Sequence, residues 1–151
     1  MSMQTYRTEG ATIHALLVED NPADVELTTL TLKRSKIILN MDIVHDGEEA
    51  LKYLFKEDHH SDVPTPDIVL LDLNIPRVNG IDVLKKVKST PSTAHIPIII
   101  LSSSESEIDI LKSYKEKANC YLTKPLGLKE FETLVKSIEN FWFSVVKLPP
   151  K

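Results

Sequence analysis

The sequence predicts an α/β domain with a five-stranded parallel sheet and helices on both of its faces. Five short apolar runs alternate with five segments whose apolar residues recur at helical spacing. This alternation is typical of parallel strands joined by crossover helices. A chain of 151 residues suits one domain with one sizeable core. We therefore assign the chain to a single domain with a core over about 12–143 and tails at 1–11 and 144–151.

The first half of the chain contains two predicted strands and two predicted helices. Asn21 can cap the first helix, and Pro22 fits its first position. The polar residues 56–66, with two histidines and two prolines, predict a surface loop. In order, we expect strand Ile13–Val18, a helix from Pro22 to near Ser35, strand Met41–Val44, a helix from Asp46-Gly47, and the loop.

The second half contains three predicted strands and three predicted helices. Residues 96–101 form the most hydrophobic run, which indicates a central strand buried on both faces. Pro97 lies at the start of this strand, where a missing amide donor does least harm. In order, we expect strand Ile68–Leu71, a helix after Asn79-Gly80, strand Ile96–Leu101, a helix opened by Ser102-Ser103-Ser104-Glu105, a strand through Cys120–Leu122, and a helix from Leu128 to about Phe143.

Composition and charge argue against several classes of function. The net charge of −4 disfavours a general nucleic-acid binder, because phosphate backbones demand basic surfaces. No apolar stretch approaches the length of a membrane span. Cys120 is the only cysteine, so no internal disulfide can form. These features favour a cytoplasmic protein that binds neither nucleic acid nor a membrane.

Polar side chains follow four of the five predicted strands. Glu19 and Asp20 come after the first strand, Asp72 after the third, Ser102 after the fourth and Lys124 after the fifth. The carboxyl ends of parallel strands share one edge of a sheet, so we expect these side chains to converge. Crowded carboxylates are unfavourable unless a cation lies among them or their pKa values rise, and a set of oxygen ligands favours Mg²⁺. The edge is therefore predicted to hold a metal ion and a phosphoryl group.

From Thr12 to about Asn140 the chain resembles a response-regulator receiver domain. Ser102 lies 30 residues after Asp72, and Lys124 lies 22 residues after Ser102, which are the usual intervals of that family. The sequence departs mildly in having Glu19 where Asp is commoner, Ser102 rather than Thr, and a longer loop at 56–66. The resemblance implies a flavodoxin-like, doubly wound (βα)5 fold. It rests on Glu19, Asp20, Asp72, Pro76, Gly80, Ser102 and Lys124-Pro125.

The resemblance implies a role for each acid. Asp72 is the expected nucleophile that takes a phosphoryl group from a phosphohistidine on a sensor histidine kinase. Asp20, Asp72 and the main-chain carbonyl of Asn74 are expected to bind Mg²⁺ directly. Glu19 is expected to act through a metal-bound water.

The resemblance also implies partners for the phosphoryl group and a switch. Lys124 is expected to pair with one phosphoryl oxygen, and Ser102 to donate its hydroxyl to another. Tyr121 occupies the family's position for a switch aromatic, and rotates inward when Ser102 moves toward phosphate. Without the resemblance, Tyr121 would be interpreted as a half-buried tyrosine of the strand that serves packing. Whether Lys124-Pro125 is cis stays open.

The C-terminal end carries three consecutive aromatic residues, Phe141, Trp142 and Phe143. One helix face cannot bury all three, so we expect them to contact another chain in a homodimer. The alternative is a tail folded back on its own domain. This end is similar to that of stand-alone receivers paired with phytochrome-type kinases.

The leading interpretation is a single-domain response regulator that phosphorylates and dephosphorylates itself and is otherwise no enzyme. Its expected partners are a sensor histidine kinase, for which the resemblance suggests a phytochrome-like protein, and a downstream target or phosphotransfer protein. One alternative is a Mg²⁺-dependent phosphohydrolase with an aspartyl-phosphate intermediate. Such enzymes typically use an Asp two residues after the nucleophile as general acid, and here that residue is Asn74. A degenerate receiver kept for interactions is a third interpretation, which the complete residue set disfavours.

The histidines are interpreted as structural or solvated. His59 and His60 lie between acids, but no other ligand has metal-site spacing, so we expect a solvated loop. His14, His45 and His95 lie beside strands and are expected to lack partners.

Overall fold

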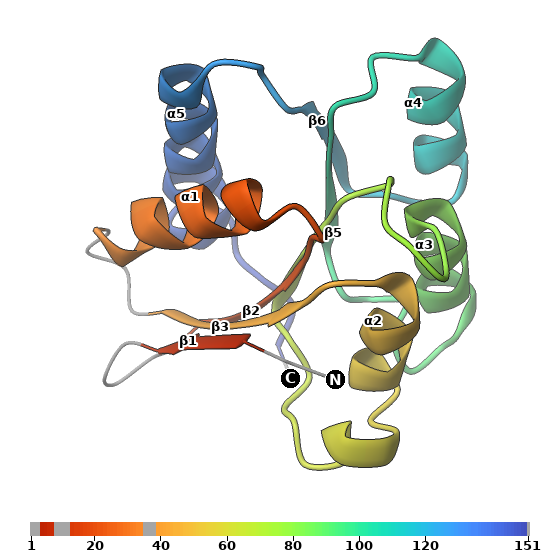
Figure 1. Cartoon of the computed structure of the whole chain (residues 1–151). Coiled ribbons are helices and arrows are strands. Elements are labelled where there is room, and N and C mark those ends of the chain that lie inside the picture. The colour runs from red at the N-terminus through yellow and green to blue at the C-terminus, as the bar shows by residue number, and fades with distance from the viewer. Residues whose placement is uncertain (1–3, 8–12, 35–38, 151) are drawn as a thin grey trace.

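The computed structural model describes residues 4–7, 13–34 and 39–150, which form one mixed sheet covered by helices on both faces (Figure 1). The strand order is β1-β3-β2-β4-β5-β6, and the five strands β2 to β6 run parallel. This arrangement confirms the predicted α/β class and the parallel sheet. The strands are β1 (Gln4–Arg7), β2 (Ile13–Val18), β3 (Leu39–Val44), β4 (Ile68–Leu71), β5 (Ile98–Ser102) and β6 (Cys120–Thr123).

Strand β1 was not predicted, because its residues were assigned to the N-terminal tail. It pairs antiparallel with β3, from Gln4 opposite Ile43 to Arg7 opposite Asn40. Three of its four residues are polar (Gln4, Thr5 and Arg7), so it lacks the apolar run by which the other strands were recognised in sequence. The sheet therefore has six strands, with an antiparallel strand added at the β3 edge.

The helices lie in two layers (Figure 1). Helices α1 and α5 cover one face of the sheet, while α2, α3 and α4 lie on the other side. The bounds are α1 (Pro22–Lys33), α2 (Gly47–Leu54), α3 (Gly80–Ser89), α4 (Glu107–Lys115) and α5 (Leu128–Ile138), with a 3₁₀ turn η1 (Asp58–His60) and a π-helical turn η2 (Glu139–Phe143). None of the helices in the described ranges is both long enough and apolar enough to cross a membrane.

Two hydrophobic cores lie on opposite faces of the sheet. Leu16 and Val18 of β2 pack with the core that contains α2 and α3, whereas Ala15 and Leu17 pack with the core that contains α1 and α5. Successive side chains of a strand point to opposite faces, so a strand buried on both sides becomes an uninterrupted apolar run. This explains why β4 is apolar throughout, and why β2 and β5 are apolar except for His14 and Ser102.

Local capping signals fix where the helices begin. The Asn21 side chain accepts hydrogen bonds from the backbone amides of Ala23 and Asp24, as predicted for the cap of α1. Helix α4 starts later than expected, at Glu107, with Ser106 as its cap. The serines before it belong to the end of β5 and a connecting loop. The helix starts here because the Ser106 hydroxyl accepts a hydrogen bond from the amide of Asp109, three residues ahead.

The last helix begins at Leu128, as predicted, but its regular part is shorter than expected. Leu128 is 75% exposed, while Phe131, Val135 and Ile138 lie in the core. The regular helix ends at Ile138, and the π-helical turn carries the aromatic residues. Every peptide bond of the described ranges is trans, including Lys124-Pro125.

The three C-terminal aromatics point in different directions. Phe143 is buried in the core beneath α1 and α5, and Trp142 is partly buried against that core. Phe141 is 54% exposed and contacts Trp142 edge to face. The chain after η2 also returns to its own domain, since Leu148 packs on the same core. Only Phe141 of the three therefore remains free to contact another chain.

Two expectations about histidines are corrected. The segment 56–66 is not uniformly solvated: its 3₁₀ turn buries His60 completely, 2.6 Å from a carboxylate oxygen of Glu49. His14 is also buried, and its Nε2 lies 2.5 Å from the hydroxyl of Tyr53. That hydroxyl in turn donates to buried Asp42. These partners were missed because they lie far from the histidines in sequence.

Candidate metal centre at the carboxyl edge of the sheet

The polar residues predicted at the carboxyl edge are placed by backbone pairing that continues beyond the strands. The amide of Glu19 donates to the carbonyl of Val44 over 3.1 Å, and the amide of Asp72 donates to that of Val18 over 3.1 Å. The amide of Lys124 donates to the carbonyl of Ser102 over 2.7 Å. Each functional residue is thus fixed by its neighbour strand, which brings the side chains to one spot.

Three acids form a set that can hold a metal ion. Glu19, Asp20 and Asp72 each offer a carboxylate oxygen, and these oxygens lie within 4.8 Å of one another. Glu19 and Asp72 are buried, whereas Asp20 is exposed and lines the hollow above the site. Oxygen donors of this kind suit a hard divalent cation. An ion can therefore enter from solvent on the Asp20 side and reach the two buried acids.

Lys124 reaches three carboxylates at once. Its Nζ donates to Glu19, to Asp24 Oδ2 over 2.9 Å and to Asp72 Oδ2 over 3.1 Å. Asp24 was not predicted as part of the site. The sequence feature that could have identified Asp24 is its position in the first turn of α1, four residues after Asp20. This position directs its side chain toward the same edge.

The balance of charge is visible in two shifted pKa values. Burial raises the pKa of Glu19 to about 7, and the charge of Asp72 adds to this, while Lys124 acts in the opposite direction. Burial disfavours the charged form of Lys124 and alone would lower its pKa. Its hydrogen bonds to Glu19 and Asp24 outweigh this effect and raise the pKa of Lys124 above its usual range. One ammonium thus faces an excess of carboxylates, which is the condition a divalent cation relieves.

The loop after Asp72 is held close to the site by a glycine. The amide of Asn74 donates to Asp72 Oδ1 over 3.2 Å, which orients the carboxylate. The amide of Gly80 donates to the carbonyl of Leu73 over 2.9 Å. A Cβ at Gly80 would lie 2.5 Å from the carbonyl oxygen of Asp72, so only glycine permits this approach.

Ser102 and Tyr121 are linked through the backbone of Ser104. Ser102 is fully buried, and its hydroxyl accepts a hydrogen bond from the amide of Ser104 over 3.2 Å. The hydroxyl of Tyr121 donates to the carbonyl of Ser104 over 2.9 Å. Tyr121 is half-buried and packs against the core on the α2–α3 side. One residue of the β5–α4 loop therefore joins the two side chains predicted to form the switch.

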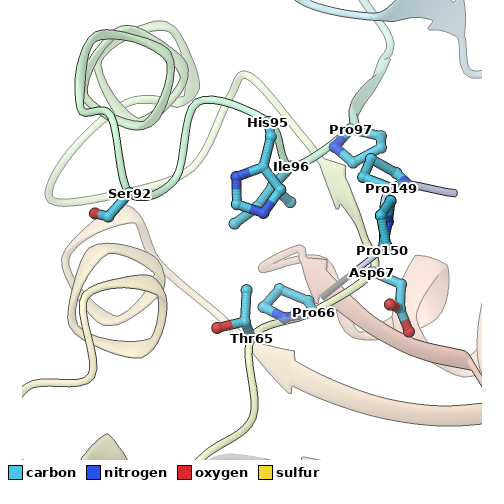
Figure 2. Close-up of a pocket in the computed structure, with 9 residues that line it drawn as sticks. All are labelled: Thr65, Pro66, Asp67, Ser92, His95, Ile96, Pro97, Pro149 and Pro150. Carbon is cyan, nitrogen blue, oxygen red and sulfur yellow. The ribbon is translucent and has the colours of Figure 1, made fainter.

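A second hollow lies at the opposite edge of the sheet, before strands β4 and β5 (Figure 2). Figure 2 shows the C-terminal Pro149 and Pro150 beside Pro97, with His95 facing the hollow. Four prolines contribute to the wall, and its one carboxylate is Asp67. The converging acids and the lysine therefore distinguish the carboxyl edge as the functional site. The residues lining the second hollow are Thr65, Pro66, Asp67, Ser92, His95, Ile96, Pro97, Pro149 and Pro150.

Comparison with known sequences matches the chain to one family. Residues 15–136 match the response regulator receiver domain. Response regulator Rcp1 of Synechocystis sp. is 40% identical over 134 residues, covering 89% of this chain and 91% of that protein. The probable methanogenesis regulatory protein FilR2 of Methanothrix harundinacea is 33% identical over 134 residues, covering 89% and 86%.

Solved structures agree with this match along nearly the whole chain. The Mn²⁺-bound form of Rcp1 superposes with a TM-score of 0.90 at 39% identity, covering 92% of this chain and all of that one. The phosphorylated cyanobacterial phytochrome response regulator RcpA superposes with a TM-score of 0.90 at 41% identity, covering 93% and 100%.

Proposed function

The chain belongs to the response-regulator receiver family of two-component signalling, and from this premise we propose that Asp72 is the residue that accepts the phosphoryl group. The observation that carries the proposal is the contact of Lys124 Nζ with Asp72 Oδ2 beside the Glu19–Asp20–Asp72 oxygen cluster. This contact supports the proposal because a buried carboxylate, an ammonium group and a set of oxygens that could hold a metal ion lie within one site.

Phosphoryl transfer at this site exchanges one bond to phosphorus for another. A carboxylate oxygen of Asp72 bonds to phosphorus as the bond from phosphorus to the kinase's histidine nitrogen breaks, and the imidazole keeps the electron pair. Lys124 then exchanges some of its carboxylate contacts for a phosphoryl oxygen, which lowers the charge on the transferred group. Ser102 lies at the end of β5, and turning its hydroxyl toward the site supplies a further donor.

Mg²⁺ is the proposed cofactor, and the Mn²⁺-bound state of the relative Rcp1 supports a divalent ion. Asp20, Asp72 and the main-chain carbonyl of Asn74 would hold it directly, with Glu19 acting through a water. When bound, Mg²⁺ supplies the positive charge that the excess of carboxylates and the phosphoryl group require.

The link through Ser104 gives the site a way to signal. When Ser102 turns toward a phosphoryl oxygen, its hydroxyl leaves the amide of Ser104. The loop can then shift and release Tyr121 from the Ser104 carbonyl, so that the ring rotates inward. The surface formed by α4, β6 and α5 would change its shape for a downstream protein or phosphotransfer partner.

The proposed partners follow from the relatives. A phytochrome-type sensor histidine kinase is the proposed donor, because RcpA is a phytochrome response regulator. We place the protein in the cytoplasm with such a kinase, as a homodimer through Phe141. The protein would catalyse its own phosphorylation and dephosphorylation without turning over any other substrate.

Incubation with acetyl phosphate and Mg²⁺ tests the proposal. The intact mass should rise by one phosphoryl group, because the small donor supplies phosphorus to a site assembled by this chain alone. Asp72→Asn should abolish the gain, and EDTA should prevent it. Asp62→Asn, which alters an exposed acid outside the oxygen cluster, is the matched control and should be labelled normally.

Two results would contradict the proposed function. Labelling of Asp72→Asn at the wild-type level would show that another residue accepts the phosphoryl group. Sustained hydrolysis of p-nitrophenyl phosphate would instead favour the aspartyl-phosphate phosphohydrolase.

A further inference from the structure

We propose that Glu49, His59 and His60 form a second metal site, which binds Zn²⁺ independently of the acidic centre. Glu49 lies in α2, and the two histidines lie in the 3₁₀ turn that follows it (Figure 1). Each residue offers a ligand atom, and the three atoms lie within 4.8 Å of one another. Sequence spacing did not reveal the set, because most of α2 and the segment after it separate Glu49 from the histidines.

The distances fit a tetrahedral ion with a small adjustment. Ligand atoms about 2.0–2.1 Å from zinc lie about 3.3 Å apart in a tetrahedron. His59 Nε2 is 3.3 Å from Glu49 Oε2, which already matches. His60 Nε2 is 2.6 Å from the same oxygen, a hydrogen bond that must open by less than one ångström to admit the ion.

Burial and charge favour a cation at this place. The side chains of Glu49 and His60 are 2% and 0% exposed. Within the described ranges, the two histidine rings are the only side chains that pair with the Glu49 carboxylate, since nearby Lys52 pairs with Glu48 and Asp58. A buried carboxylate is stable only beside compensating charge or hydrogen bonds, and a bound divalent ion provides charge to the set.

The ligand chemistry separates this set from the acidic centre. Two imidazole nitrogens and one carboxylate suit zinc, whereas an oxygen-only set suits magnesium. His59 is half exposed, so its side of the cluster opens to solvent and leaves a position for water. The site is thus reachable from solution and has three protein ligands.

Calorimetric titration with Zn²⁺ in excess Mg²⁺ tests the proposal. Wild type should bind one Zn²⁺ at this set, and His59→Ala should weaken that binding at least tenfold because a ligand is lost. His59 is half exposed, so its removal should leave the fold intact by circular dichroism. His95→Ala, which removes an exposed histidine outside the cluster, is the control and should bind as wild type does.

Imidazole ¹⁵N chemical shifts supply a direct readout. Zn²⁺ should move the ring signals of His59 and His60 and leave that of His95 in place. Glu49→Gln keeps the size of the side chain and a hydrogen-bond acceptor for His60, but removes its charge. It should lose Zn²⁺ affinity while retaining the fold.

Two outcomes overturn the second site. Equal Zn²⁺ affinity of wild type and His59→Ala would mean that zinc binds only at the acidic centre. Unmoved His59 and His60 signals at saturating Zn²⁺ would mean that the hydrogen bond between His60 and Glu49 is purely structural.

Discussion

At the scale of single residues, Lys124 is the counter-charge of the carboxyl edge. It donates to Glu19, Asp24 and Asp72, which come from two strand ends and one helix. Because the side chains of Glu19 and Asp72 are almost completely buried, their repulsion is poorly screened by water. The ammonium therefore serves both the stability of the site and its readiness for a phosphoryl group.

Replacement of Lys124 by methionine should destabilise the metal-free protein and slow its phosphorylation. The carboxylates would lose their buried ammonium, which we expect to lower the free energy of unfolding by about 1–3 kcal/mol in EDTA. Excess Mg²⁺ should restore much of this loss by supplying charge. Urea unfolding with and without Mg²⁺ measures both effects.

Lys136→Met is the control for this substitution, because Lys136 is exposed and its one ion pair among the described residues is with Glu132. We expect its unfolding free energy to change by less than about 0.5 kcal/mol. Equal losses for the two lysines would contradict a special role for Lys124.

The raised pKa of Glu19 gives the metal-free protein a defined pH dependence. Unfolding returns the pKa from about 7 to 4.5, so the folded state binds a proton that the unfolded state releases between these values. The contribution of Glu19 to stability is therefore present below about pH 4.5 and is lost as the pH rises to about 7.

Urea unfolding of wild type and Glu19→Gln in EDTA, from pH 5 to pH 8, measures this dependence. Wild type should lose stability relative to Glu19→Gln as the pH rises, since glutamine resembles the protonated acid. Parallel curves for the two proteins would refute the shifted pKa.

At the scale of elements, the loop between β4 and α3 sets the position of Asp72. Gly80 allows the start of α3 to approach the backbone of Asp72 and Leu73. The amide of Gly47, at the start of α2, donates to the carbonyl of Pro76 in the same loop. Two helix starts therefore brace the segment that carries the phosphoacceptor.

Gly80→Ala should damage both stability and phosphorylation. The added methyl group would lie 2.5 Å from the Asp72 carbonyl oxygen and from the Cα of Leu73, so the loop must move. We expect a loss of about 1–3 kcal/mol in the free energy of unfolding and slower labelling by acetyl phosphate.

Gly127→Ala serves as the matched control. The three heavy atoms nearest to a methyl group at Gly127 would all belong to the end of the Glu130 side chain, which can turn aside. Its effect on unfolding should stay under about 1 kcal/mol, and labelling should be normal. A Gly80 variant as stable and active as this control would show that the loop adapts freely.

Features that depend on local sequence patterns were predictable, whereas features that depend on contacts between distant residues were not. Asp72 and Lys124 were predictable because parallel topology alone carries strand ends to one edge. The pairing of β1 and the burial of His60 were not predictable, because both depend on contacts with residues distant in sequence. Asp24 was missed because helix geometry, rather than a strand end, brings it to Lys124. Local patterns thus identified the parallel sheet and most of its site, while single long-range contacts required the structure.

At the scale of the whole molecule, the surface near the C-terminus offers apolar side chains to another chain. Phe141 and Val145 are 54% and 69% exposed beside the buried Phe143. Covering an apolar patch of this kind with a second copy of the chain would stabilise a dimer. A dimer interface at this position, at the end of α5, would lie beside the surface that the switch is proposed to alter.

Phe141→Ser should convert the proposed dimer to a monomer. Light scattering on concentrated samples should give twice the chain mass for wild type and the chain mass for the variant. Leu111→Ser alters an equally exposed residue of α4 and should leave the dimer intact. A dimer lost with Leu111→Ser but kept with Phe141→Ser would put the interface on α4 instead.

The short strand β1 has a consequence for how the protein behaves in a crowded solution. It occupies the hydrogen-bonding edge of β3, whose residues include the buried Met41, Ile43 and Val44. An uncovered edge of this apolar kind is a template for strand addition between molecules and for aggregation. Deleting residues 1–7 should therefore produce concentration-dependent turbidity on mild heating, which the intact chain resists. Strand β1, which contributes no residue to the metal centre, would thus protect the sheet edge from pairing with another molecule.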